Sequence, residues 1–300
     1  MKEFKDDREG FIFNSLNVAF MIIFSAIMLY PFWNTIAVSF NEAIDTVRGG
    51  ITLYPRKFTL QNYKILFKNS SIFNAFMVSV ARTLINVVTN VLFTSMIAYV
   101  LSRPKFILKK PFTLILVLSM YVNAGLIPTY FLIKELHLLN TFWVYVVPGM
   151  ISAFNFLILR TFLRTIPESL IESVKMDGGG DYTIFFRIIL PLSKPALATI
   201  ALFVAVGAWN SWFDTLIYAS GRVNLHTLQY KLMEYLQSSQ AQSRGSGEIG
   251  AMAMSKASNM VTPVSMRAAI TVVAAAPIIL VYPFMQRYFV LGMNLGGVKE

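Results

Sequence analysis

Long apolar stretches dominate this chain of 300 residues and restrict the folds open to it. A helix needs about 20 mostly apolar residues to cross the hydrocarbon core of a bilayer. Backbone polar groups in lipid must pair within the structure, which favours helices over open sheets. The sequence therefore predicts an all-α, polytopic membrane protein with six transmembrane helices. The six stretches that meet the length requirement are residues 12–38, 73–101, 111–133, 142–163, 195–219 and 267–291.

The composition agrees with a lipid environment. Hydrophobic residues make up 56% of the chain and charged residues 14%, against about 45–50% and 25% in soluble domains. The mean hydropathy is +0.59. One soluble core of this size could not cover so much apolar surface.

Several kinds of chemical site are excluded by residue type. The chain has no cysteine, which removes disulfides and thiolate metal ligands. Its two histidines, His137 and His226, lie far apart without a second ligand at zinc spacing. The phosphate-binding pattern GxxxxGK[ST] is also absent. We therefore expect no metal, no catalytic residue and no cofactor in this chain.

The net charge of +11 gathers beside the ends of the apolar stretches. That placement is typical of a positive-inside membrane protein and not of a nucleic-acid binder. Residues 102–110 carry four basic side chains and residues 160–194 carry five, so both are predicted to be cytoplasmic. An even number of spans places both termini on the same side. The predicted organisation is a cytoplasmic segment 1–11, a transmembrane domain 12–291 with core 73–291, and a cytoplasmic tail 292–300.

Two long connections, residues 41–72 and 220–266, are predicted to face the exterior. In the second, His226 to Leu236 has the pattern of an amphipathic helix. The Ser-, Gln- and Gly-rich residues 237–250 that follow are typical of a flexible linker. A disordered loop without a specific role remains an open alternative for this region.

The segment from Ile166 to Pro195 is too polar to span and too regular to be a simple connector. Pro167 suits the start of a helix. Glu168 and Glu172 are four residues apart, so they share one face near the positive end of that helix. We therefore expect a helix to begin at the start of this segment.

An apolar stripe at helical spacing, formed by Leu170, Ile171 and Val174, runs along the same predicted helix. The run 177–180, Asp-Gly-Gly-Gly, should stop it, because glycine adopts left-handed turns without steric cost. Asp181 can cap a second short helix, residues 182–189, which Leu190 and Pro191 end. The stripe would need a partner surface. An amphipathic segment lying on the membrane is the alternative.

This segment resembles the EAA loop of binding-protein-dependent ABC importer permeases. That signature is roughly Glu-Ala-Ala, a variable pair, Asp-Gly, and then Ile-x-Leu-Pro. Here the run 172–174, Glu-Ser-Val, replaces Glu-Ala-Ala, Asp177 and Gly178 match Asp-Gly, and 188–191 reads Ile-Ile-Leu-Pro. Both alanines are therefore replaced. The resemblance implies roles in ATPase coupling for Glu168, Glu172, Ser173, Asp177, Gly178, Gly179, Leu190 and Pro191.

The resemblance extends over most of the chain and is strongest to permeases that import carbohydrates, similar to the maltose type. Supporting stretches are LSR at 101–103, GLIPTY at 125–130, LNT at 139–141, WNSWFD at 209–214 and the ending from Tyr282. It implies a type I permease fold with cytoplasmic coupling helices in the cell membrane. It also implies a second permease, two ATPase subunits that bind ATP and Mg, an external solute-binding protein and a sugar or oligosaccharide solute.

Polar residues inside predicted spans are candidates for a solute pathway, because they are costly in lipid. Amides and carboxylates suit sugar hydroxyls, and aromatic rings suit sugar C–H faces. Alternatives are open: asparagines also join helices, tryptophans anchor at interfaces, and Arg82 could snorkel or meet an anionic, uronate-containing solute. The candidates are Arg82, Asn86, Asn90, Tyr121, Asn123, Asn155, Trp209, Asn210, Trp212 and Asp214.

Two other classes of membrane protein have sequence requirements that can be compared with this chain. An ion-coupled secondary transporter should carry several ionisable residues near helix centres, and this chain offers few, with no evident pair. An intramembrane enzyme would need a nucleophile with a base, or a metal cluster, within the helices. Neither pattern is evident, so an ABC importer permease is the predicted function.

Overall fold

The structure is a computed structural model that describes the backbone of residues 8–104, 106–245 and 262–294. Side chains are described for residues 10–104, 106–237 and 262–283. This part of the chain is helical, without a β-strand, and one isolated antiparallel bridge joins Asn41 and Phe58. The all-α prediction is therefore confirmed. The described residues fall in two compact units, one within Met1–Asn69 and Glu234–Ala275, the other within Ser70–Met233 and Ala276–Glu300.

The first unit contains a long apolar helix and a compact connection. Its helices are α1 (Arg8–Ser39), α2 (Ala43–Val47), α3 (Gln61–Lys68) and the start of α15 (Pro263–Asn294). Helix α1 covers the predicted span 12–38 and continues through Pro31. Most of its apolar side chains are exposed, although Ala37 near its end is buried. Such exposure is the pattern of a helix that contacts lipid or another subunit.

Polar side chains order the connection between α1 and α3. Asn41 donates from Nδ2 to Asp45 Oδ2 at 3.0 Å and accepts from the Lys57 backbone N–H at 2.9 Å. Asp45 Oδ2 also accepts from Arg56 Nε at 2.9 Å. Asn62 donates to the backbone carbonyls of Ser39 and Asn41. These contacts fold residues 41–62 back onto the end of α1.

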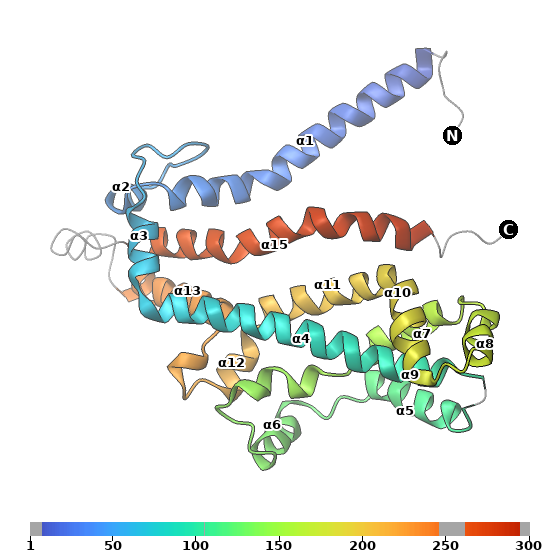
Figure 1. The fold of residues 1–300 in the computed structure, drawn as a ribbon. Helices are drawn as coiled ribbons and strands as arrows, with labels where there is room; N and C mark the ends of the chain where they lie inside the picture. The colour runs from blue at the N-terminus through green and yellow to red at the C-terminus, as the bar shows by residue number, and fades with distance from the viewer. Residues whose placement is uncertain (1–7, 105, 246–261, 295–300) are drawn as a thin grey trace. The chain divides into compact units, whose positions relative to one another are not determined.

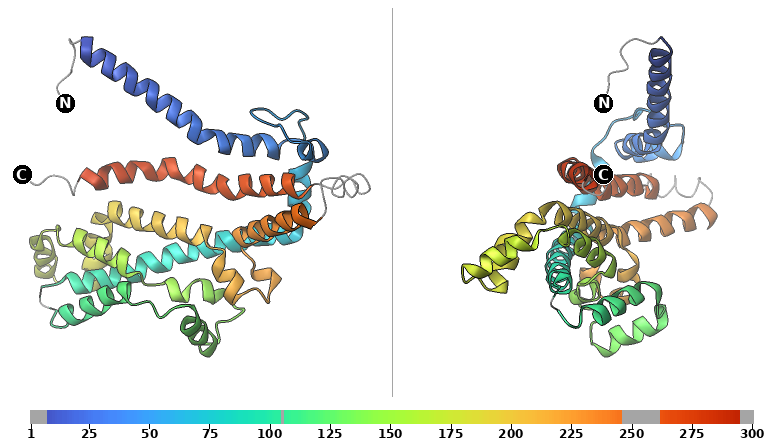
Figure 2. Two further views of the ribbon diagram at one scale, coloured as in Figure 1. Left: turned by 180° about the vertical axis from the view of Figure 1, so that it is seen from behind. Right: turned by 90° about the vertical axis from the view of Figure 1, so that its right-hand side faces the viewer.

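The second unit is built around α4, which packs against α11 and α7. Figures 1 and 2 show α4 and α11 side by side. The elements are α4 (Ser70–Ser102), α5 (Lys109–Tyr121), α6 (Leu126–Glu135), η1 (Phe142–Tyr145), η2 (Val147–Gly149), α7 (Ala153–Leu163), α8 (Glu168–Met176), α9 (Asp181–Ile184), the π-helical turn η3 (Phe185–Ile189), α10 (Leu190–Leu192), α11 (Lys194–Asn210), α12 (Phe213–Tyr218), η4 (Val223–Leu225) and the start of α13 (Leu228–Gly245).

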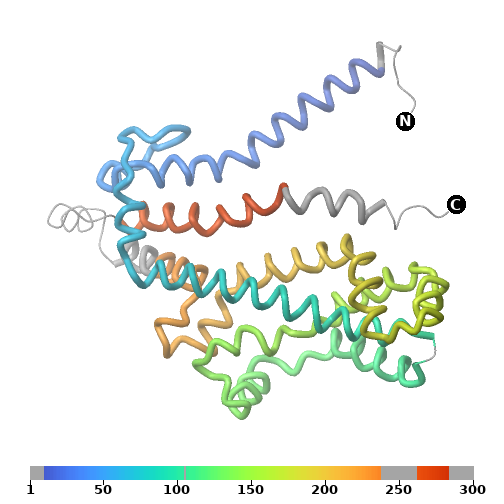
Figure 3. Tube along the Cα trace, viewed as in Figure 1, coloured from blue at the N-terminus to red at the C-terminus, as the bar shows by residue number. Residues whose placement is uncertain are grey.

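The predicted span 111–133 is not one helix. It divides into α5 and α6, and Figure 3 traces the chain through the break between them. Val122 is extended, and the Asn123 side chain accepts from the Gly125 N–H at 2.9 Å. Gly125 has φ +86°, a left-handed conformation that glycine adopts freely. The local turn chemistry therefore overrides the apolar pattern.

Two further predicted spans are broken. Residues 142–163 form η1 and η2 followed by α7, with a bend of 45°. The stretch 195–219 stops at Asn210, and α12 begins only at Phe213. Three helices are long and apolar enough to cross a membrane alone: Gly10–Ser39, Ser70–Ser102 and Pro263–Pro283. Two bent helix pairs raise the number to at most five in the described part of the chain. The predicted count of six transmembrane helices is therefore not confirmed by these residues.

The connection 220–266 also differs from expectation. The amphipathic helix expected at His226 begins at Leu228 as α13 and continues to Gly245. Residues 237–245, expected to be flexible linker, are therefore helical. Ser and Gln disfavour helix only weakly, and they extend a helix that already exists. The rest of the predicted linker, residues 246–250, lies outside the described residues.

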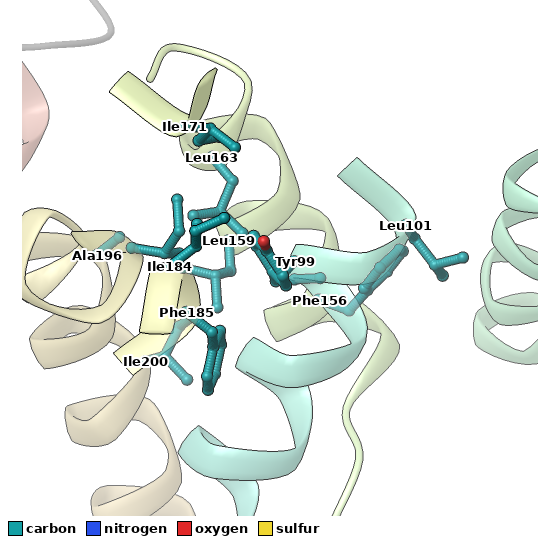
Figure 4. Close-up of a cluster of buried hydrophobic side chains, with 12 residues drawn as sticks. Tyr99, Leu101, Phe156, Leu159, Leu163, Ile171, Ile184, Phe185, Ala196 and Ile200 are labelled. Carbon is teal, nitrogen blue, oxygen red and sulfur yellow. The ribbon is translucent and has the colours of Figure 1, made fainter. Parts of the chain in front are cut away.

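A buried apolar cluster at one end of α4 holds the second unit together. Figure 4 shows it at the meeting of α4, α7, α8, α9 and α11. Phe156 and Leu159 come from α7, Tyr99 from α4, and Ile184 and Ile200 from α9 and α11. Full burial of such side chains contributes about 1.5–3 kcal/mol each, so this cluster fixes the position of the segment between α7 and α11.

The contacts of Asp45 predict a pH-dependent connection in the first unit. The Asn41 carboxamide, together with the Arg56 guanidinium, outweighs burial and holds the pKa of the Asp45 carboxyl below its usual value. The stabilisation is complete above the unfolded pKa of about 3.9 and is lost as pH falls through the folded pKa. Hydrogen exchange of amides 49–57, corrected for intrinsic rates, should therefore accelerate only in strong acid.

Hydrogen exchange at pH 7 tests whether Asp45 orders this connection. Asp45→Ala should accelerate exchange across amides 49–57, because Asn41 and Arg56 lose their shared acceptor. Glu42→Ala is the matched control, since Glu42 forms an exposed ion pair with Lys57 that should contribute little. Equal exchange rates in the two variants would contradict the assignment.

Candidate functional site

A cavity of about 560 Å³ lies within the second unit. Five of the ten predicted pathway residues line it: Arg82, Asn86, Asn90, Asn155 and Asp214. The wall contains further polar or aromatic residues that sequence reasoning missed. These are Tyr145, Ser152, Phe203, Ser211 and Tyr218.

The asparagines on α4 pair with backbone that the broken span exposes. Asn86 Nδ2 donates to the Tyr145 carbonyl at 2.9 Å, and Asn90 Nδ2 donates to the Gly149 carbonyl at 2.7 Å. Asn155 Nδ2 donates in turn to Asn90 Oδ1 at 3.1 Å. Short 3₁₀ turns leave carbonyls that an α-helix would satisfy. The amides therefore join helices, the structural alternative weighed for them, and they also line the cavity.

Arg82 does not snorkel. Its side chain is only 4% exposed and forms an ion pair with Asp214. Its Nη1 donates to the Ser211 carbonyl at 3.0 Å, and its guanidinium lies 4.5 Å from the centre of the Tyr145 ring. The expectation that no ionisable residues pair inside the predicted spans was therefore wrong. The partners are 132 residues apart, so no local pattern indicates the pair.

The other five candidates lie away from this cavity in the described structure. Tyr121 is 81% exposed at the end of α5, and Asn123 instead forms the turn before Gly125. Trp209 is buried edge-on against Phe76.

The last two candidates of that group follow Trp209 along the chain. Asn210 accepts from Gln229 Nε2 at 3.2 Å. Trp212 packs edge-on against Phe213. The break after Asn210 explains the separation, because residues expected within one helix belong to a helix end, a turn and a new helix.

The break in the predicted span 142–163 has a visible signal in the sequence. Pro148 and Gly149 interrupt the predicted span 142–163, and both disfavour a continuous helix. Gly149 sits close to Asn86, because a Cβ added at Gly149 would lie 3.4 Å from Asn86 Oδ1. A Pro-Gly pair in one predicted span, together with an amide side chain in a neighbouring span, thus indicates a helix break whose backbone carbonyls accept hydrogen bonds from that side chain.

Segment 166–195 forms the predicted helix, glycine turn and second helix. Helix α8 begins at Glu168 after Pro167 and ends at Met176, with Asp177 as its C-cap. Gly178 has φ +81°, its N–H bonds the Lys175 carbonyl, and the Gly179 N–H bonds the Val174 carbonyl at 2.8 Å. These two bonds make a Schellman motif.

The two glycines of this motif are needed for different reasons. Gly178 supplies the torsion, since its φ is positive and a Cβ there would meet no atom within 4 Å. Gly179 supplies room, because a Cβ there would lie 2.5 Å from Val174 Cγ1. The predicted left-handed turn is confirmed.

The second helix differs from the prediction in two details. Asp181 is the first residue of α9 and makes no capping hydrogen bond, and Gly180 holds the cap position. The helix does not end at Leu190 and Pro191 but runs through η3 into α10. Pro191 is the second residue of α10. The chain then bends by 78° into α11.

The predicted apolar stripe on α8 is divided between the core and the surface. Ile171 is only 4% exposed and joins the cluster shown in Figure 4, and Val174 packs against it. Leu170 is exposed, as are Met176 and Tyr182. The stripe was expected to need an external partner, but its own unit covers most of it.

A second cavity, of about 330 Å³, lies beside α8. Glu168 and Glu172 line it from α8, and Asp181 lines it from α9. Arg103 from the end of α4 lies across from them, with its guanidinium 4.6 Å from the centre of the Tyr99 ring. Acidic and basic side chains therefore line the same cavity beside α8.

No group of His, Asp or Glu in the described residues could hold a metal ion. The site instead offers amides, one ion pair and aromatic rings. These groups suit the binding of a polar, hydroxylated solute or the passage of such a solute.

Known proteins resemble this chain over nearly its whole length. The profile of a family described as "Binding-protein-dependent transport system inner membrane component" matches residues 72–294. The Polygalacturonan/rhamnogalacturonan transport system permease protein YtcP of Bacillus subtilis (strain 168) is 36% identical, covering 96% of this chain and 98% of that protein. The Arabinooligosaccharides transport system permease protein AraQ of Halalkalibacterium halodurans is 27% identical, covering 95% of each chain.

A solved structure agrees with these sequence relatives. It is one chain of a bacterial ABC transporter involved in the import of the acidic polysaccharide alginate. It superposes with a TM-score of 0.83 at 27% identity, covering 95% of this chain and 99% of that chain.

The contacts of Asn86 predict a measurable loss of stability. Asn86→Leu would leave the Arg82 and Tyr145 carbonyls without their shared donor, at a cost of about 1 kcal/mol or more. The melting temperature of the purified protein in detergent should fall. Asn210→Leu is the control, because Asn210 is exposed and makes one contact with Gln229. A larger fall for Asn210→Leu than for Asn86→Leu would refute this reading of α4.

Proposed function

Because this chain belongs to the family of binding-protein-dependent transport system inner membrane components, we propose that it is the transmembrane permease subunit of an ATP-driven ABC importer for a sugar or oligosaccharide. The observation that carries the proposal is the polar cavity of about 560 Å³ inside the region that the family profile covers. A pathway for a hydroxylated solute needs such a lining. The chain transports and does not catalyse.

The proposed solute is an oligosaccharide derived from a polysaccharide, with uronate units. Two similar proteins support this choice, one named for polygalacturonan and rhamnogalacturonan and the other involved in alginate import. The cavity wall supplies amides from Asn86, Asn90 and Asn155, which can exchange hydrogen bonds with sugar hydroxyls. Tyr145 and Tyr218 add aromatic surface for sugar C–H faces.

The proposed assembly follows from the family. A second, different permease would complete the pathway, two ATPase subunits would bind ATP and Mg, and an external binding protein would deliver the solute. We further propose the type I arrangement with six crossings and both termini cytoplasmic. On that proposal, α5 and α6 together supply the crossing that neither makes alone.

Segment 166–195 is the proposed contact with the ATPase. Glu168, Glu172 and Ser173 are exposed on α8, and the Schellman turn at Gly178 and Gly179 sets the direction in which the chain leaves it. Closure of the ATPase dimer would move α8 as a rigid body and change access to the cavity. Exposed Leu170 and Met176 give the partner apolar surface. Asp177, Leu190 and Pro191 shape the ends of the two helices.

An ion-coupled secondary transporter was the alternative function. Family membership does not favour it. The ion pair that the cavity does contain joins Arg82 to Asp214 within one unit, and such a fixed pair braces helices as readily as it carries protons.

Solute-stimulated ATPase activity tests the proposal. The chain purified alone should hydrolyse no ATP, because it lacks the phosphate-binding pattern. In liposomes with its cognate permease, ATPase and binding protein, galacturonate oligosaccharides should raise hydrolysis several-fold above the basal rate. Hydrolysis that ignores every oligosaccharide but follows an imposed proton gradient would overturn the assignment.

The glycine turn predicts a separation of coupling from insertion. Gly178→Val forces a β-branched residue to φ +81°, at a cost of roughly 1–2 kcal/mol or more. The turn should distort while the apolar spans still insert normally, so stimulation of the ATPase should be lost. Gly180→Ala is the control, because Gly180 has φ −80° and nothing lies within 4 Å of an added Cβ.

Both variants should reach the membrane in wild-type amounts. Stimulation that survives in Gly178→Val, or that disappears equally in Gly180→Ala, would contradict the coupling role of this turn.

A further inference from the structure

The cavity of about 560 Å³ contains one cation and one anion among its lining residues, Arg82 and Asp214. A free arginine in such a place would be the natural receptor for the carboxylate of a uronate sugar. Whether Arg82 can act in this way depends on what its donors already contact. The answer determines which chemical groups of the solute this subunit can distinguish.

The donors of Arg82 are directed at the protein. Nη2 pairs with Asp214, and Nη1 donates to the Ser211 carbonyl at 3.0 Å. The face of the guanidinium lies over the Tyr145 ring, and Nε is buried without a hydrogen bond. With the side chain 4% exposed, a solute carboxylate could reach this cation only by displacing Asp214.

Asp214 is the more accessible member of the pair, with 36% of its side chain exposed. Its Oδ2 accepts from Arg82 and from Ser211 Oγ, the latter at 2.8 Å. Within the described structure no hydrogen bond engages Oδ1. The pair therefore presents the cavity with an acceptor whose charge Arg82 has already balanced.

We infer that the Arg82–Asp214 pair makes this half of the pathway electrically neutral and selects for sugar hydroxyls, so that the carboxylates of an anionic solute are recognised elsewhere in the transporter. Asp214 Oδ1 and the amide oxygens accept from hydroxyls, and a carboxylate finds no free cation. The inference rests on the proposed function, because it names which part of the sugar this subunit reads. Arg82 is then a positioning residue that acts through Asp214.

The same pair also braces the break between α11 and α12. Ser211 lies in that break, and both its backbone carbonyl and its hydroxyl are held by the two charged residues. Removing one member leaves the other as an uncompensated charge in a low-dielectric site, whereas removing both leaves the cavity neutral. This asymmetry separates a neutralised pair from a carboxylate receptor.

The test compares uptake of a galacturonate oligosaccharide with uptake of its neutral methyl ester. Membrane vesicles contain the cognate partners and the same binding protein throughout, so the preference of the binding protein cancels between variants. The ratio of acid to ester uptake should rise in Asp214→Asn, which frees the arginine, and fall in Arg82→Gln, which frees the carboxylate. In the double variant Arg82→Gln with Asp214→Asn the ratio should return to within about twofold of wild type.

A receptor role for Arg82 predicts a different result for the double variant. Loss of a direct charged contact lowers affinity about tenfold or more, so the acid-to-ester ratio would stay tenfold low, which would overturn the inference. If the double variant fails to assemble, Asp214→Asn alone decides the matter. A raised ratio supports the inference and an unchanged ratio refutes it.

A second measurement does not depend on the solute. The melting temperatures of the two single variants should both fall, and the double variant should recover part of the loss, because the charges compensate each other. Purely additive losses would overturn the pairing. Wild-type vesicles that take up neither sugar would refute the proposed solute class instead, and the melting temperatures would then decide the inference about the pair.

Discussion

The fold of the second unit depends on one constraint, which is that backbone carbonyls released by a broken span must find donors away from water. The span that includes η1, η2 and α7 is broken at Pro148 and Gly149, and the donors come from α4. Asn86 and Asn90 lie four residues apart on one face of that helix and reach the Tyr145 and Gly149 carbonyls. An apolar α4 would leave those carbonyls unpaired.

The same arrangement creates the cavity. Because η1 and η2 are short 3₁₀ helices and not a continuation of α7, this span cannot pack against α4 along its whole length. The space that remains is lined by the amide side chains that bond the carbonyls at the break. The break between α11 and α12 behaves in the same way, with Arg82 from α4 bonding the Ser211 carbonyl. One face of α4 therefore both supports two interrupted spans and supplies the polar wall between them.

Sequence reasoning predicted the features that depend on local pattern. The apolar length of α1 and α4 and the positive φ at Gly178 follow from neighbouring residues, and the structure agrees with them. What it could not give were the breaks near Asn123 and Ser211, because these two residues act through turns that hydropathy does not register. Half of the proposed pathway residues lie elsewhere for that reason. The Arg82–Asp214 pair joins residues 132 positions apart, which no single sequence could indicate.

The Schellman turn has a mechanical consequence. Residues on either side of it, Ile171 and Ile184, are buried in the same apolar cluster, and the N–H groups of Gly178 and Gly179 bond the Lys175 and Val174 carbonyls. With the coupling role proposed for α8, a displacement of α8 would therefore reach the cluster that also contains Tyr99. Tyr99 and Arg82 belong to one unbroken helix and stand about 25 Å apart at 1.5 Å per residue. Helix α4 therefore connects the apolar cluster beside α8 to the wall of the cavity of about 560 Å³ as one continuous helix.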